Sequence, residues 1–157
     1  MRFAVLLSLA LVAGAGAAAD PAAPRVWEVN GIRLEAEQVE RLSGDIARQT
    51  VEAVRRVEGL TLRDGQDQAL EAIYRETALE VYDRAVAVVN RGDLDDAAKE
   101  QQVKQLVLNG QRRSTAYVEQ VLGPAQYGVY RAWEDRQVEA FEKRGLWSGS
   151  SRGRKGR

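Results

Sequence analysis

The sequence predicts an all-α fold: a long antiparallel helical hairpin or a four-helix arrangement, with a small β-hairpin at its N-terminal end. Three observations lead to this. Apolar residues recur at helical spacing, with charges between them, through most of residues 36–143. The interruptions are short and carry Gly, Pro or Asn, so successive helices must run antiparallel. One strand-like stretch, VWEVNGIRL, precedes the first helix.

The N-terminus, MRFAVLLSLALVAGAGAAAD, has the features of a secretory signal. A single Arg is followed by an apolar run and then by small residues, which predicts a signal peptide over residues 1–19 with cleavage near Ala19. The apolar run is too short for a retained membrane helix, so no integral membrane segment is expected after cleavage. The expected location is periplasmic or secreted, with a linker at 20–25 leading into a helical domain at 26–144.

The residue types that are missing exclude several kinds of chemistry. The chain has no Cys and no His, and its only Met is the initiator. There is consequently no disulfide framework, imidazole base, thiolate nucleophile or soft metal ligand. Carboxylates remain, but no D-x-D-x-D-G calcium loop is present. We expect a protein that is not an enzyme and that uses no cofactor or metal.

Charge argues against nucleic acid as a partner. The 23 basic and 23 acidic residues balance, and removing residues 1–19 takes away one Arg, which leaves a net charge of about −1. The stretch 145–157, with its Gly, Ser and four positive charges in RGRKGR, is expected to be a disordered basic tail. A solubilising role is the simpler interpretation, and weak attraction to an anionic lipid or polymer is the alternative. Leu146 and Trp147 are expected to pin its base to the helices.

Residues 26–34 predict the β-hairpin. Asn30-Gly31 favours a two-residue type I′ turn, because both residues accept positive φ. Such a turn pairs Val29 with Ile32 and places the apolar residues of both strands on one face. We expect the hairpin to cover one end of the helical core.

Four helices are predicted from the apolar periodicity. They run over about residues 36–58, 64–89, 94–121 and 124–143. Asn109-Gly110 interrupts the third helix in sequence, but the apolar phase continues across it. A single helix, with or without a kink, is therefore expected there.

A repeated pattern, L-x-x-x-Q, stands at predicted helix starts. It occurs at Leu34–Gln38, Leu62–Gln66 and Leu122–Gln126. In the last case Gly123 is expected to be the N-cap, Pro124 the first helical residue and Gln126 the residue that folds back to the cap amide.

The second copy allows two alternatives: a box between Thr61 and Asp64, or Asp64 itself as the cap. The two Leu residues can act as hydrophobic staples. The predicted structural helix-cap residues are Leu62, Gln66, Leu122, Pro124 and Gln126.

With two such openings about sixty residues apart behind a signal peptide, the chain resembles the LTxxQ-motif family of periplasmic proteins, the Spy/CpxP-like chaperones and stress modulators. That resemblance implies an all-helical, curved, often dimeric protein that holds unfolded clients without ATP. Arg63 and Gly123 stand where the family has Thr, and the His, Cys and Met of its metal-responsive members are missing, so metal sensing is not expected. The V-N-G-hydrophobic hairpin followed by a helix is similar instead to the N-terminal domain of SurA-like chaperones.

Two functions from different classes fit these features. The first is an ATP-independent chaperone or envelope stress modulator that binds unfolded or partly folded proteins on an amphipathic open layer, with a homodimer as one arrangement. The second is a structural or interaction protein, a closed helical bundle that docks one envelope partner. Aromatic residues at helical spacing also fill cores, which is the simpler interpretation of any one of them. The predicted client-binding residues are Tyr74, Tyr82, Tyr117, Tyr127, Tyr130 and Trp133.

Overall fold

The computed structural model describes residues 26–29 and 32–143, and these are mostly helical. The predicted mainly helical class is confirmed. The predicted signal peptide, the linker, the Asn30-Gly31 turn and the basic tail lie outside the described residues. In chain order the elements are β1 (Val26–Val29), β2 (Ile32–Glu35), α2 (Ala36–Arg55), α3 (Gln66–Val89) and α4 (Asp96–Glu142).

The two strands form an antiparallel pair that leads directly into α2. Trp27 lies opposite Leu34, Glu28 opposite Arg33 and Val29 opposite Ile32. The last residue of β2, Glu35, is the N-cap of α2, and its backbone N–H donates to Gln38 Oε1 over 2.8 Å. This bond satisfies one of the amides that a helix start leaves without an intrahelical partner.

The connection between α2 and α3 differs from the prediction at both of its ends. The first helix ends at Arg55 rather than near residue 58, because the Val57 N–H bonds to Val54 O in a tighter turn and Gly59 then takes a φ of 81°. The next helix begins at Gln66, after Gly65 with a φ of 81°. Its N-cap is therefore Gly65, and neither proposed role of Asp64 is realised.

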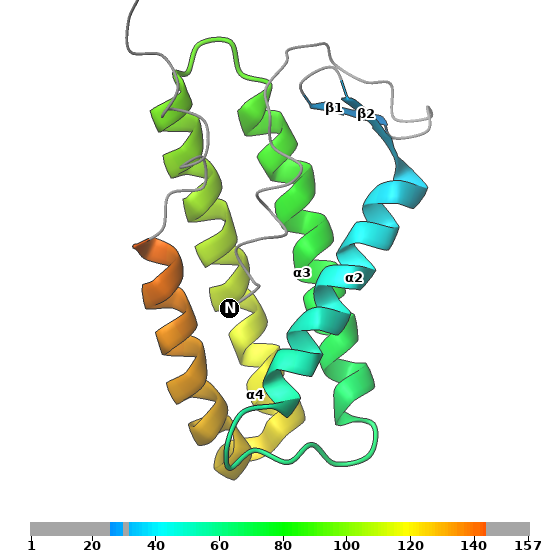
Figure 1. Ribbon diagram of the computed structural model, residues 1–157, viewed down its shortest axis with the longest axis vertical. Helices are drawn as coiled ribbons and strands as arrows, with labels where there is room; N and C mark the ends of the chain where they lie inside the picture. The colour runs from blue at the N-terminus through cyan, green and yellow to red at the C-terminus, as the bar shows by residue number, and fades with distance from the viewer. Residues whose placement is uncertain (1–25, 30–31, 144–157) are drawn as a thin grey trace, which may run out of the picture.

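The helices predicted at 94–121 and 124–143 lie within α4, which is interrupted at Gly123. This residue has φ 72° and ψ 168°, a conformation that glycine alone adopts readily, and Pro124 follows it. Figure 1 shows the consequence: the chain reverses there, and the last part of α4 runs back alongside the first part. The described residues thus form three helices, the last of which is interrupted at Gly123.

Two apolar clusters hold these segments together. α2 packs on α3, α3 packs on α4, and β1 also contacts α3. The larger cluster joins α2, α3 and both parts of α4 near the Gly123 reversal, and the smaller one joins α3 to the start of α4. The buried residues of the larger cluster are Ala47, Val51, Val54, Val57, Leu60, Leu70, Tyr74, Val118, Leu122 and Tyr130, and those of the smaller are Ala85, Val86, Val89 and Val103. None of the described helices is long and apolar enough to cross a membrane.

Candidate functional site

An elongated cavity, here called the slot, lies between the two apolar clusters. Along α3 its lining extends from Tyr74 to Tyr82, a distance of about 12 Å at the helical rise of ~1.5 Å per residue. Its volume is about 90 Å³. The lining residues are Ile46 and Thr50 of α2, Tyr74, Thr77, Ala78, Val81 and Tyr82 of α3, and Val107, Gln111, Ser114, Tyr130, Trp133, Gln137 and Phe141 of α4.

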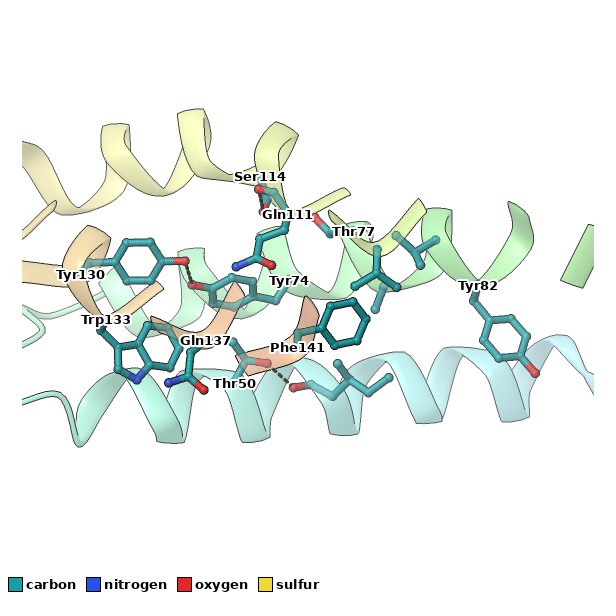
Figure 2. Close-up of a pocket in the computed structure, with 14 residues that line it drawn as sticks. Thr50, Tyr74, Thr77, Tyr82, Gln111, Ser114, Tyr130, Trp133, Gln137 and Phe141 are labelled. Carbon is teal, nitrogen blue, oxygen red and sulfur yellow. Dashed lines mark hydrogen bonds between the residues drawn. The ribbon is translucent and has the colours of Figure 1, made fainter. Parts of the chain in front are cut away.

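The walls of the slot are uncharged. No Asp, Glu, Lys or Arg is among the lining residues, and most of the lining surface is aromatic or aliphatic. Trp133, Phe141, Ala78 and Tyr82 are only half-buried, so the slot communicates with solvent. Figure 2 shows Tyr74 and Tyr130 meeting near one end, with Tyr82 at the other. Such a surface favours apolar, uncharged occupants.

A buried hydrogen-bond chain borders the slot. Tyr74 Oη donates to Tyr130 Oη over 3.0 Å, and Tyr130 Oη donates to Glu134 Oε1 over 2.9 Å. Glu134 is only 2% exposed and also lies 3.1 Å from Thr115 Oγ1, and Arg131 Nη1 is 3.6 Å from its other oxygen. A carboxylate removed from water in this way depends on such donors for its stability.

Burial raises the pKa of the Tyr130 hydroxyl, and the neighbouring Tyr74 and Glu134 raise it further. Burial likewise raises the pKa of Tyr74. Both phenols therefore stay protonated and act as donors well above neutral pH. Both hydroxyls therefore keep their hydrogen bonds in the chain to Glu134 at neutral pH.

The predicted client-binding aromatic residues do not share one open surface. Tyr74 and Tyr130 are 7% and 1% exposed and belong to the larger core cluster, so their prediction as residues of an open surface is wrong. Their hydroxyls bond to each other, and the four-segment packing encloses the rings. Tyr82, Tyr127 and Trp133 are half-buried, and Tyr117 is 60% exposed. The slot brings Tyr74, Tyr82, Tyr130 and Trp133 together, but not Tyr117 or Tyr127.

The two glutamines of the repeated pattern meet across the fold. Gln66 Nε2 donates to Gln126 Oε1 over 2.9 Å, and Gln126 Nε2 lies 3.1 Å from Gln66 Oε1. Gln66 Nε2 also donates to Val121 O over 2.7 Å, and Gln126 Nε2 donates to Thr61 O. Each glutamine therefore bonds the carbonyl that precedes its counterpart by five residues.

This pairing revises the predicted cap roles. Gln66 Oε1 does accept the Arg63 N–H over 2.8 Å, but Gln126, expected to fold back onto its own helix start, instead reaches across to Thr61 and Gln66. Leu122 is buried in the larger cluster and Leu62 packs against it, whereas Pro124 is exposed. Because the Gly123 reversal leaves carbonyls without helical partners, the Gln66 amide satisfies one of them.

Replacing either glutamine should weaken the fold by about 1 kcal/mol, since partly buried hydrogen bonds are lost on both sides. Gln66→Ala and Gln126→Ala together should cost less than the sum of the two, because they remove the same pair. Gln68→Ala, at an exposed position of the same helix, is the matched control and should change stability by less than about 0.5 kcal/mol. Urea denaturation measures all four variants, and strictly additive costs would show that the two amides do not interact.

Sequence reasoning missed Glu134, Thr115, Gln111 and Gln137. Glu134 lies four residues after Tyr130, which puts it on the same helix face. That spacing was the available signal. The glutamines carry no signal of their own, because only the packing of α2 and α3 beside α4 forms the slot that they line.

The described residues hold no group of three or more His, Cys, Asp or Glu side chains that is arranged to bind a metal ion. Comparisons of the chain with protein-family models, curated proteins and solved structures found no match. The resemblance to the LTxxQ-motif family therefore depends only on two short motifs of this chain, Leu62–Gln66 and Leu122–Gln126.

Proposed function

We propose that this protein is an exported, non-enzymatic interaction protein of the cell envelope, which docks an apolar segment of a polypeptide partner in the slot. In this proposal the two parts of α4 count as separate helices, so that the chain forms a four-helix bundle with the β1–β2 hairpin at one end. The protein needs no cofactor and works by binding alone.

The uncharged, largely apolar lining of the slot is the observation that carries the proposal. An apolar hollow that remains open to solvent gains stability when an apolar group fills it. All four helical segments contribute to its walls, so an occupant would contact the whole bundle at once. The volume of about 90 Å³ suits a single inserted side chain and is smaller than the roughly 150 Å³ cavity known to take up benzene.

A general chaperone is the second candidate function. It is supported by the half-buried Tyr82, Tyr127 and Trp133 and by the exposed Tyr117, which offer apolar surface to varied clients. The burial of Tyr74 and Tyr130 counts against the broad aromatic face on which this function was first predicted. The geometry therefore favours docking of one segment over loose capture of many.

Filling the slot should abolish docking. Ala78→Leu adds three carbon atoms to its wall and should weaken binding of a short, neutral, Leu-containing peptide at least tenfold. Ala116→Leu, on an exposed face of α4, should leave binding unchanged. The fluorescence of Trp133, which lines the slot, reports binding when Trp27 and Trp147 are replaced by Phe. Equal affinities for both variants would contradict the proposal.

Suppression of aggregation separates the two candidate functions. An unfolding, disulfide-reduced client is incubated with the full chain or with the Ala78→Leu variant at matched ratios. Interaction through the slot predicts no protection of unrelated clients, or protection that Ala78→Leu removes. Protection of several unrelated clients that survives Ala78→Leu would establish the chaperone candidate instead.

A further inference from the structure

Two carboxamide side chains line the slot without a hydrogen-bond partner. Gln111 comes from the part of α4 before the reversal and Gln137 from the part after it, and both are half-buried. Among the residues that the structure describes, neither side-chain amide makes a hydrogen bond. The hydroxyl groups of Ser114 and Thr115 donate to the backbone carbonyl of Gln111, not to its side chain. Figure 2 shows Gln111 near Tyr74 and Gln137 near Trp133.

Five of the hydroxyl groups that line the slot already donate hydrogen bonds within the protein. Thr50 and Thr77 each donate to the carbonyl four residues earlier over 2.8 Å, and Ser114 donates to Gln111 O over 2.8 Å. Tyr74 and Tyr130 form the chain that ends at Glu134. The side-chain amides of Gln111 and Gln137 are therefore available to form hydrogen bonds with an occupant of the slot.

The chemistry of the slot selects against anions. It offers no cation to pair with a carboxylate or phosphate, and the buried Glu134 lies directly behind Tyr130. A fatty acid or phospholipid headgroup would thus be desolvated there without a partner. A carboxamide both donates and accepts hydrogen bonds, which complements the N–H and C=O of a peptide backbone.

We propose that the slot binds an extended, uncharged peptide segment, with one aliphatic side chain in the cavity and backbone amide groups hydrogen-bonded to Gln111 and Gln137. This inference rests on the proposed function, since it names the occupant of the same slot. It makes the two glutamines determinants of peptide binding, in addition to the apolar walls.

The probe is the peptide Gly-Ser-Leu-Ser-Gly, acetylated and amidated at its ends, titrated against the full chain. Gln111→Met and Gln137→Met keep the length of each side chain and remove its amide. Each should raise the peptide's Kd roughly threefold to tenfold, as expected for one lost hydrogen bond. Gln120→Met, at an exposed position of α4, is the matched control and should leave Kd unchanged.

An analogue of the peptide with esters in place of the two amides that flank Leu tests the other side of the contact. It should bind more weakly than the parent peptide, and Gln111→Met and Gln137→Met should affect it less. Peptides with Asp or Trp in place of Leu should not bind, because the slot is uncharged and too small for an indole.

The outcomes separate this inference from the proposed function. If the parent peptide binds, Ala78→Leu prevents it and the Gln→Met variants bind normally, the slot docks peptides without amide recognition and the inference is overturned. If the parent peptide does not bind, or binds Ala78→Leu equally well, the proposed function itself fails. Displacement of the peptide by oleate would overturn the exclusion of anions.

Discussion

Tyr130→Phe is expected to lower the free energy of unfolding by about 2–3 kcal/mol, although it removes a single oxygen atom. The Tyr130 hydroxyl accepts from Tyr74 and donates to Glu134, and all three side chains are buried. Its loss leaves the Tyr74 hydroxyl without its acceptor and removes one donor from the buried Glu134 carboxylate, which keeps only Thr115 Oγ1 and the more distant Arg131. The second of these is the more costly, because unsatisfied charged groups lose the most solvation.

The control is Tyr117→Phe, which removes a hydroxyl from a side chain that is 60% exposed and should change stability by less than about 0.5 kcal/mol. A further variant removes the whole network: Tyr74→Phe, Tyr130→Phe and Glu134→Leu in one chain. It should be more stable than Tyr130→Phe alone, because no buried polar group is left without a partner. Guanidinium denaturation gives these differences, and a silent Tyr130→Phe would show that water replaces the lost donor.

Much of the helical architecture could be predicted from periodicity, because amphipathic spacing is a local property. The C-terminal bound of α3 at Val89 matches the end of the predicted apolar run. The errors arose at glycines. Gly59 and Gly65 take positive φ beside helix ends that apolar spacing does not mark, whereas the break at Gly123 was predicted.

The site was harder to predict, because its parts lie far apart in sequence. Tyr74 and Tyr130 were identified as notable residues but assigned to an exposed surface, since spacing does not tell which helix covers which face. The hydrogen bond between Gln66 and Gln126 likewise forms only because the chain reverses at Gly123. The repeated L-x-x-x-Q pattern indicates that the two helix starts are alike, but not that they lie side by side. The burial of Glu134 was not predicted, because most carboxylates lie at the protein surface.

Gly110 lies in the interior of α4, where a glycine ordinarily weakens a helix. The residue is buried within α4, where it faces α3, and a Cβ added to it would lie 2.6 Å from Val81 Cγ2 and 3.3 Å from Thr77 Cγ2. Both neighbours line the slot. The two helices can therefore approach this closely only because no side chain stands at 110.

Gly110→Ala is accordingly expected to lower the free energy of unfolding by up to about 2 kcal/mol, since overpacking costs ~1–3 kcal/mol and the gain in helix propensity offsets only about 1 kcal/mol of it. Gly128→Ala is the matched control: it is exposed in the same helix, nothing lies within 4 Å of its added Cβ, and it should be stabilising. In a Val81→Ala background the clash with Val81 Cγ2 disappears, so the added methyl at 110 should then be neutral or stabilising. Thermal and denaturant unfolding of the four variants measure this coupling. Stabilisation by Gly110→Ala in the wild-type background would mean that α3 and α4 are less closely packed in solution than this geometry requires.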